Sequence, residues 1–212
     1  MKKIIFFNLP MKSMKNNEAC YLDKGNVNCK CEAKVKFGLI AALYGRIKKE
    51  DDVLVILNET ESKSKNCNEE NIEFFKQEFE TVLKIKLTEE ENLKVVKSPF
   101  TETREQMQTL YRTLLSFIEE DCHIYADTTF GPRLNMPVCF SVFSFAERFY
   151  NAQVKFILNV KAIFDPETNK VIEGSQELYD IMPFYSLSNM TMAMKAKNGD
   201  QALKMLDDFF KL

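Results

Sequence analysis

Short apolar segments alternate with helical stripes along most of this chain. Between the apolar segments, hydrophobic residues recur every three or four positions, as Val35, Leu39, Leu43 and Ile47 do, which is the spacing of one face of an amphipathic helix. Five segments have the apolar composition of buried strands: residues 3–7, 53–57, 93–97, 123–126 and 154–164. Apolar strands separated by amphipathic helices are typical of a parallel sheet that is covered on both faces.

This alternation predicts an α/β fold of the Rossmann-like, doubly wound kind with a mainly parallel sheet, because right-handed crossovers arrange successive strands and helices in that way. A turn at residues 165–169, followed by apolar residues near Val171, predicts a short C-terminal hairpin, and a helical tail follows it. We expect a domain over residues 1–185 and a tail over residues 186–212 that packs on the domain or on a dimer partner. A polar loop is expected at residues 8–30.

The loops that follow the predicted strands are the candidates for a binding site. In doubly wound sheets, ligands bind beyond the carboxyl ends of the strands, where the strand order reverses. The four candidate loops span residues 8–13, 58–62, 98–104 and 127–135. The last of them is the most informative, because a strand, a polar turn, a glycine, an arginine and a helix follow one another there.

The loop at residues 127–135 combines several groups that can bind an anion. Gly131 allows the backbone to approach a ligand closely, and Thr128 and Thr129 carry hydroxyls. The first backbone amides of the following helix attract negative charge, and the guanidinium of Arg133 can bind a phosphate through two N–H groups. These groups predict a site for a negatively charged nucleotide. The alternative is an ordinary capped turn with an exposed arginine.

The same loop resembles a motif of a known family. Asp127, Thr129, Gly131 and Arg133 match the pattern D-x-T-H-G-x-R, and Phe130 stands in place of the histidine. In these residues the chain resembles one branch of the CARF (CRISPR-associated Rossmann-fold) proteins. The resemblance covers roughly residues 1–190, since three further pieces fall in the family's order: the opening strand that ends at Asn8, the segment 98–102 and the segment 178–184.

The resemblance implies a homodimer that binds a cyclic tetra- or hexa-adenylate across its two-fold axis. It also implies a role in CRISPR-associated antiviral defence. A stand-alone sensor domain of this family is often a ring nuclease, which cleaves the cyclic messenger without a metal ion. The ribose 2′-hydroxyl then attacks its own phosphodiester, and the protein positions it and stabilises charge on the phosphate. The alternative is a sensor without catalytic activity that regulates a separate effector.

The candidate residues follow from the loops and from the resemblance. The expected catalytic residues are Lys12, Ser13 and Arg133. The expected ligand-binding residues are Asn8, Asn58, Thr101, Asp127, Thr128, Thr129, Phe130, Gly131, Arg133 and Asn135.

Three of these residues have a second interpretation. Phe130 either stacks on an adenine or packs in the core below the turn. Lys12 lies in a lysine-rich loop, where a solvated charge is the alternative to a catalytic one. Asp127 either contacts the ligand or orients the turn by accepting hydrogen bonds from backbone amides.

Composition and missing motifs limit the other function classes. No apolar run approaches the ~20 residues that a membrane helix needs, and we expect a cytoplasmic protein with free thiols. Cys20, Cys29 and Cys31 cluster, but there is no CxxC pair and His123 is the only histidine, so we expect no metal and no cofactor. The chain lacks GxGxxG and GxxxxGK[ST] motifs, which argues against a dinucleotide enzyme and a P-loop ATPase. Another nucleotide-binding enzyme on the same fold remains a third hypothesis.

The charges are unevenly distributed, although the net charge is only −2. Residues 1–50 hold eleven Lys and Arg against four Asp and Glu, whereas residues 51–100 hold seven against twelve. A basic first quarter can face a phosphate ligand, and a solvated lysine-rich loop is the alternative.

Overall fold

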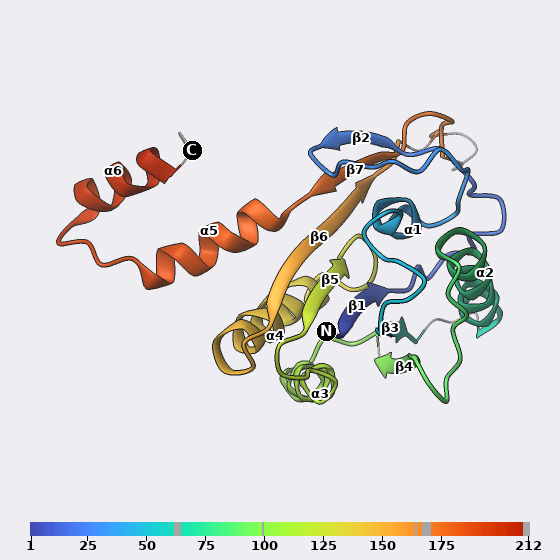
Figure 1. The fold of residues 1–212 in the computed structure, drawn as a ribbon, viewed down its shortest axis with the longest axis horizontal. Helices are drawn as coiled ribbons and strands as arrows, with labels where there is room; N and C mark the ends of the chain where they lie inside the picture. The colour runs from blue at the N-terminus through green and yellow to red at the C-terminus, as the bar shows by residue number, and fades with distance from the viewer. Residues whose placement is uncertain (62–64, 99, 164, 167–170, 210–212) are drawn as a thin grey trace. The chain divides into compact units, whose positions relative to one another are not determined.

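The computed structural model describes residues 1–61, 65–98, 100–163, 165–166 and 171–209. Seven strands form one sheet in the order β2-β7-β6-β5-β1-β3-β4 (Figure 1). Their bounds are β1 Lys3–Asn8, β2 Leu22–Gly25, β3 Val53–Thr60, β4 Leu93–Ser98, β5 His123–Asp127, β6 Gln153–Lys161 and β7 Glu177–Asp180. The predicted positions Ser62, Pro99, Phe164, 167–169 and 210–212 lie outside the described residues.

The five strands predicted from the apolar segments form the parallel part of the sheet. β1 pairs in parallel with β3 on one side and with β5 on the other. The chain therefore runs outward from β1 through β3 to β4, and then returns to build β5 and β6 on the opposite side. This order is that of a doubly wound Rossmann-like sheet, and it confirms the predicted fold class. The strand order reverses between β1 and β5.

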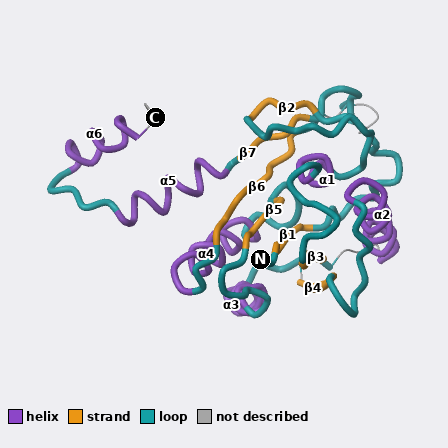
Figure 2. Tube along the Cα trace, viewed as in Figure 1, coloured by secondary structure: helices purple, strands orange, loops and turns teal. Residues whose placement is uncertain are grey.

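Helices cover both faces of the sheet (Figure 2). They are α1 Gly38–Leu43, α2 Lys65–Leu83, α3 Arg104–Leu115 and α4 Asn135–Phe149. Alternate residues of β1 point to opposite faces, as the pleat requires. Phe7 stacks on Phe75 of α2 with ring centroids 4.7 Å apart, whereas Phe6 packs on Phe143 of α4 at 5.2 Å. Burial on both faces explains why β1 and β3 are apolar over most of their length.

The structure corrects the predicted polar loop at residues 8–30. Four of its residues form β2, which pairs in parallel with β7 at one edge of the sheet. β7 in turn pairs antiparallel with β6, which forms the expected C-terminal hairpin, but the return strand lies at Glu177–Asp180 rather than near Val171. The sequence of β2, Leu-Asp-Lys-Gly, is largely exposed and has no apolar alternation, so its pairing depends on β7 rather than on burial of its own side chains.

The first helix is shorter than its apolar stripe predicted. Val35 forms an isolated bridge with Ala19 instead of a helical turn, and the helix ends at Leu43, just before Gly45, whose φ is +80°. All six residues of α1 are buried, so this helix is enclosed on every side rather than amphipathic. The third helix begins at Arg104, and its N-cap Thr103 forms a capping box with Gln106.

The chain divides into two compact units, Met1–Ile181 and Met182–Leu212. The second unit contains the helices α5, Met182–Ala193, and α6, Gly199–Phe209, and so the C-terminal tail is helical as expected. Its packing on the domain or on a dimer partner stays a prediction. Within the described parts of the chain, the helices are all too short or too polar to cross a lipid bilayer.

Candidate functional site

The turn that was predicted to bind an anion lies where the strand order reverses. It follows β5, which is the neighbour of β1, so its residues are close to the end of β1. Phe7 pairs in register with Asp127, and the two strands therefore deliver Asn8 and the turn to the same edge of the sheet. This edge is where doubly wound folds bind ligands.

Asp127 and the two threonines fasten this turn to the sheet. The backbone amide of Thr129 donates to Oδ1 of Asp127 over 2.8 Å, and Oγ1 of Thr129 accepts a hydrogen bond from the amide of Val160 at the same distance. The hydroxyl of Thr128 donates to the carbonyl of Leu158 over 3.2 Å. Asp127 thus has the orienting role that was its second interpretation.

Asp127 is also the most strongly buried carboxyl of the site, with 2% of its surface exposed. Burial raises its pKa to about 6, against the opposing effect of hydrogen bonding from Thr129. A charged carboxylate is disfavoured there because it has lost its water. Perturbed carboxyls of this kind are frequent at functional sites, although structural networks produce them too.

Gly131 gives the turn a backbone conformation that brings it against β1. Its φ is +93°, in the region that side chains rarely adopt. A Cβ atom at this position would lie 2.9 Å from Nδ2 of Asn135 and 3.4 Å from Cβ of Asn8. Gly131 was expected to let the backbone approach a ligand closely. In this chain it lets the backbone approach the side chains of Asn8 and Asn135.

Three asparagines form a buried network below the turn. Oδ1 of Asn8 accepts a hydrogen bond from Nδ2 of Asn58 over 3.0 Å and a longer one from Nδ2 of Asn135 over 3.5 Å. Asn8 and Asn58 are partners in the register of β1 and β3, so the parallel pairing itself brings them together. All three predicted residues are buried, which places them beneath the surface that a ligand would touch.

Polar atoms without partners are concentrated at this edge of the sheet. Most of the buried side-chain oxygens that accept or donate no hydrogen bond among the described residues lie there: Asn58 Oδ1, Thr60 Oγ1, Ser98 Oγ, Asp127 Oδ2 and Asn135 Oδ1. An unpaired buried polar group costs free energy, so native proteins keep few of them. Their concentration at the carboxyl ends of the strands supports a functional role for this part of the sheet, because buried polar groups without hydrogen-bond partners are expected at functional sites.

The start of α4 carries both a carboxylate and the predicted arginine. The amide of Leu134 donates to Oε1 of Glu102 over 2.7 Å, so an acidic side chain occupies one of the helix N-terminal donors expected to attract a phosphate. Arg133 is exposed, and no side chain in the described part of the chain pairs with it. Thr101, from the same loop as Glu102, donates to Oε1 of Gln106 over 2.8 Å and is exposed.

The loop after β1 is held by α2. Nδ2 of Asn71, which is fully buried, donates to the carbonyls of Pro10 and Lys12, and its Oδ1 accepts from the amide of Met14, each over 2.9 Å. The side chain of Lys12 is exposed. Ser13 is exposed as well, and its hydroxyl donates to Oε2 of Glu70 over 3.0 Å.

A cavity of about 470 Å³ opens beside the turn, between it and the β6–β7 hairpin. Thr129 and Phe130 of the predicted turn form one side of its wall. Other residues of the wall were not among the predicted site residues. They include Tyr21, Lys161, Gln176 and Tyr179. Phe130 is half-buried and meets Phe7 edge to face at 6.4 Å, so it packs on the core and lines the cavity as well.

These four residues of the cavity wall belong to no recognisable sequence motif. Tyr21 lies just before β2, the edge strand, and Gln176 lies just before β7, its neighbour, so that only the pairing of β7 with β6 brings them to the predicted turn. Tyr21 and Tyr179 are aromatic, but a tyrosine is common in ordinary cores and does not by itself indicate a site.

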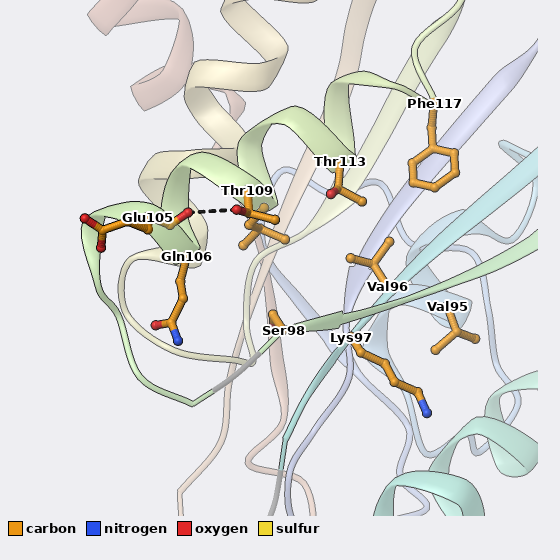
Figure 3. A pocket seen from close by; sticks show the side chains of 10 residues that line it. Val95, Val96, Lys97, Ser98, Glu105, Gln106, Thr109, Thr113 and Phe117 are labelled. Atoms are coloured by element: carbon orange, nitrogen blue, oxygen red, sulfur yellow. Dashed lines mark hydrogen bonds between the residues drawn. The ribbon is translucent and has the colours of Figure 1, made fainter.

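A second cavity, of about 390 Å³, lies beside β4, the outermost strand on the other side of the sheet from β2, between that strand and α3. Figure 3 shows Val96 and Phe117 on its apolar side and Thr109, whose hydroxyl donates to the carbonyl of Glu105 over 2.9 Å. None of the predicted site residues lines this cavity. It is separate from the turn after β5.

The described residues contain no group of three or more His, Cys, Asp or Glu side chains that could hold a metal ion. Cys20, Cys29 and Cys31 are free thiols. Burial raises the pKa of Cys29, whose Sγ donates to the carbonyl of Ala41 over 3.4 Å.

The sequence matches no model of a known protein family, and it is similar to no curated protein sequence.

Proposed function

We propose that this protein binds a cyclic oligoadenylate at the carboxyl edge of its parallel sheet, as a homodimer in which each chain contributes one set of loops. The observation that carries the proposal is the position of the turn after β5. The turn stands at the reversal of strand order, lies against Asn8 through Gly131, and is followed directly by the exposed Arg133. A cyclic tetra- or hexa-adenylate has an even number of identical units, which suits a two-fold interface.

The exposed cations support a phosphate ligand. Arg133 and Lys12 are both exposed, and neither pairs with an acidic side chain within the described residues. A guanidinium that is not engaged in an ion pair can donate two N–H groups to one phosphate.

We further propose that the bound ring is cleaved without a metal ion. The ribose 2′-hydroxyl attacks the adjacent phosphorus, the bond to the 5′-oxygen breaks, and the proton lost by the 2′-hydroxyl is balanced by the one that the leaving 5′-oxygen takes up. The products are a 2′,3′-cyclic phosphate and a 5′-hydroxyl. Lys12 and Arg133 would stabilise charge on the phosphate, and Ser13 would orient the ribose.

One observation favours the alternative of a sensor without catalysis. The hydroxyls of Ser13 and Thr128 already donate to Glu70 and to the carbonyl of Leu158, and Oγ1 of Thr129 accepts from Val160. Side chains held in this way give a rigid binding surface, but they must exchange partners before they can assist a reaction. A sensor needs only the binding surface.

Incubation with labelled cyclic tri-, tetra- and hexa-adenylate separates these functions. The protein is treated with a chelator, incubated with each ring, and the products are resolved by chromatography. A ring nuclease converts the tetra- or hexa-adenylate into linear products that end in a cyclic phosphate. A sensor retains the ring intact and bound. If none of the three rings binds, the proposed function is wrong.

A further inference from the structure

The cavity beside the turn contains a buried polar group that no neighbour satisfies. Gln176 is 5% exposed and lines the cavity, and its Oε1 has no hydrogen-bond partner among the described residues. Its backbone is fixed, because its carbonyl accepts a hydrogen bond from the amide of Leu22 over 2.9 Å. A side-chain acceptor that is desolvated and has no partner favours a ligand that brings a hydrogen-bond donor.

Three of the residues that line the cavity with Gln176 are aromatic, and the hydroxyls of the two tyrosines among them are already engaged. The hydroxyl of Tyr21 donates to the carbonyl of Lys36 over 2.8 Å, and that of Tyr179 donates to Oε2 of Glu177 over 2.6 Å. Phe130 is held by its edge-to-face contact with Phe7. These three residues therefore offer mainly carbon surface to the cavity, which suits a flat, apolar ring.

The one charged side chain among the described residues of the wall is Lys161, which is exposed. A cavity of about 470 Å³ falls within the range of small-molecule sites, and it has room for one nucleotide rather than for a whole cyclic tetramer. The wall thus combines aromatic surface, one buried acceptor and one exposed cation, which is the complement of a base, its exocyclic amine and a phosphate.

We infer that this cavity binds one adenine base of the ligand, and that the side-chain amide of Gln176 turns toward the base so that its buried Oε1 accepts a hydrogen bond from the 6-amino group. This inference rests on the proposed function and names the part of the site that recognises the base. A glutamine pairs well with adenine because it can accept from the 6-amino group and donate to N7. Hypoxanthine has a carbonyl oxygen in place of the amine, so it presents an acceptor to the acceptor of Gln176.

The test measures base preference with single nucleotides, which do not need the dimer or the ring. The full-length protein is titrated with adenosine 5′-monophosphate and with inosine 5′-monophosphate by calorimetry, alongside three variants. Gln176→Met removes the acceptor at similar volume. Gln176→Glu keeps an acceptor oxygen, whether ionised or protonated. Gln108→Met makes the same substitution at an exposed position on α3 and serves as the matched control.

The wild-type protein and Gln108→Met should prefer the adenosine nucleotide by about tenfold, the effect of one satisfied buried acceptor. Gln176→Met should lose this preference, and Gln176→Glu should keep it. Equal affinity of the wild-type protein for the two nucleotides, no binding of either, or an unchanged preference in Gln176→Met would each overturn the inference.

Titration of the same proteins with cyclic tetra- and hexa-adenylate separates this inference from the proposed function. If the rings bind the wild-type protein and Gln176→Met equally well, the base site is wrong while the function stands. If the single nucleotide binds through Gln176 and no ring binds, the base site stands and the proposed function is wrong.

Discussion

The backbone amide of Thr129 donates a hydrogen bond to Oδ1 of Asp127 over 2.8 Å, in a place where the carboxyl group is almost completely buried. This bond sets the shape of the turn that follows β5. Oδ2 of Asp127 has no partner among the described residues. The shape of the turn is therefore formed around a buried carboxyl group whose pKa is raised, so that ionisation of this group is unfavourable in the folded chain.

This arrangement predicts a specific pH dependence of stability. The folded pKa of Asp127 is raised from 3.8 to about 6, so the folded state binds this proton more tightly than the unfolded state, and stability falls as the pH rises through that interval. Asp127→Asn keeps an acceptor for Thr129 and removes the charge. Relative to the wild type, this variant should gain about 2–3 kcal/mol of stability between pH 4 and pH 7.

Urea denaturation of both proteins across this range measures the difference directly. Glu78 has its own pKa raised to about 7, chiefly by burial, against hydrogen bonds from the amides of Lys36 and Phe37. Because Glu78 is present in both proteins, its contribution cancels in the comparison. A difference between the two proteins that does not change with pH would show that Asp127 titrates normally.

Gly131 provides a test of the close approach between the turn and β1. Gly131→Ala adds a Cβ at a φ of +93°, 2.9 Å from the buried Asn135 side chain, so both backbone strain and crowding should destabilise it, by about 2–3 kcal/mol. Gly45→Ala is the matched control, because Gly45 has a φ of +80° and no atom within 4 Å of the added Cβ. It should cost about 1 kcal/mol.

The comparison of the two glycine variants by their urea midpoints isolates the crowding. Equal losses of stability would mean that the turn does not press on Asn8 and Asn135 in the way described.

The loop that carries Lys12 and Ser13 should depend on Asn71. Asn71→Ala leaves the amide of Met14 without its acceptor and the carbonyls of Pro10 and Lys12 without their donor, at a cost of about 2–3 kcal/mol. Hydrogen exchange of the Met14 amide should then accelerate more than exchange within β1, because the loop opens locally.

The control for Asn71 lies on the same helix. Asn68 is buried too, but its side chain donates to Glu59 and to the carbonyl of Thr60 rather than to this loop. Asn68→Ala should lower global stability without a selective effect at Met14. If Met14 responds to both variants alike, Asn71 does not anchor the loop.

The extent to which the sequence predicts this fold follows from burial. Strands such as β1 and β3 are enclosed on both faces, so selection for apolar residues marks them clearly. β2 has no apolar pattern, because three of its four residues are exposed. It is held by backbone pairing with β7, which does not depend on the identity of its side chains. The length of α1 was predicted wrongly for the opposite reason. This helix is buried on every side, so it has no polar face from which its two ends could be located in the sequence.

The position of the candidate site in the fold was predictable to a similar degree. The turn at Asp127 and Gly131 could be located because a strand, a glycine and a helix follow in order, and the structure places it beside Asn8. The burial of Asn58 and Asn135 could not be predicted, since it depends on parallel register and on the depth of the turn. The position of Gln176 in the cavity wall could not be predicted either, because it depends on the pairing of β7 with β6.

The central claim is that the turn after β5 presents Arg133 to a negatively charged nucleotide, and calorimetric titration of Arg133→Ala with cyclic tetra- and hexa-adenylate tests it most directly. Arg148→Ala removes the same charge from the other end of α4 and serves as the control. We predict that Arg133→Ala lowers the affinity for the ring about tenfold or more, the value of one charged hydrogen bond to phosphate, while Arg148→Ala binds as the wild type does. Equal affinity of Arg133→Ala and the wild type would contradict the claim.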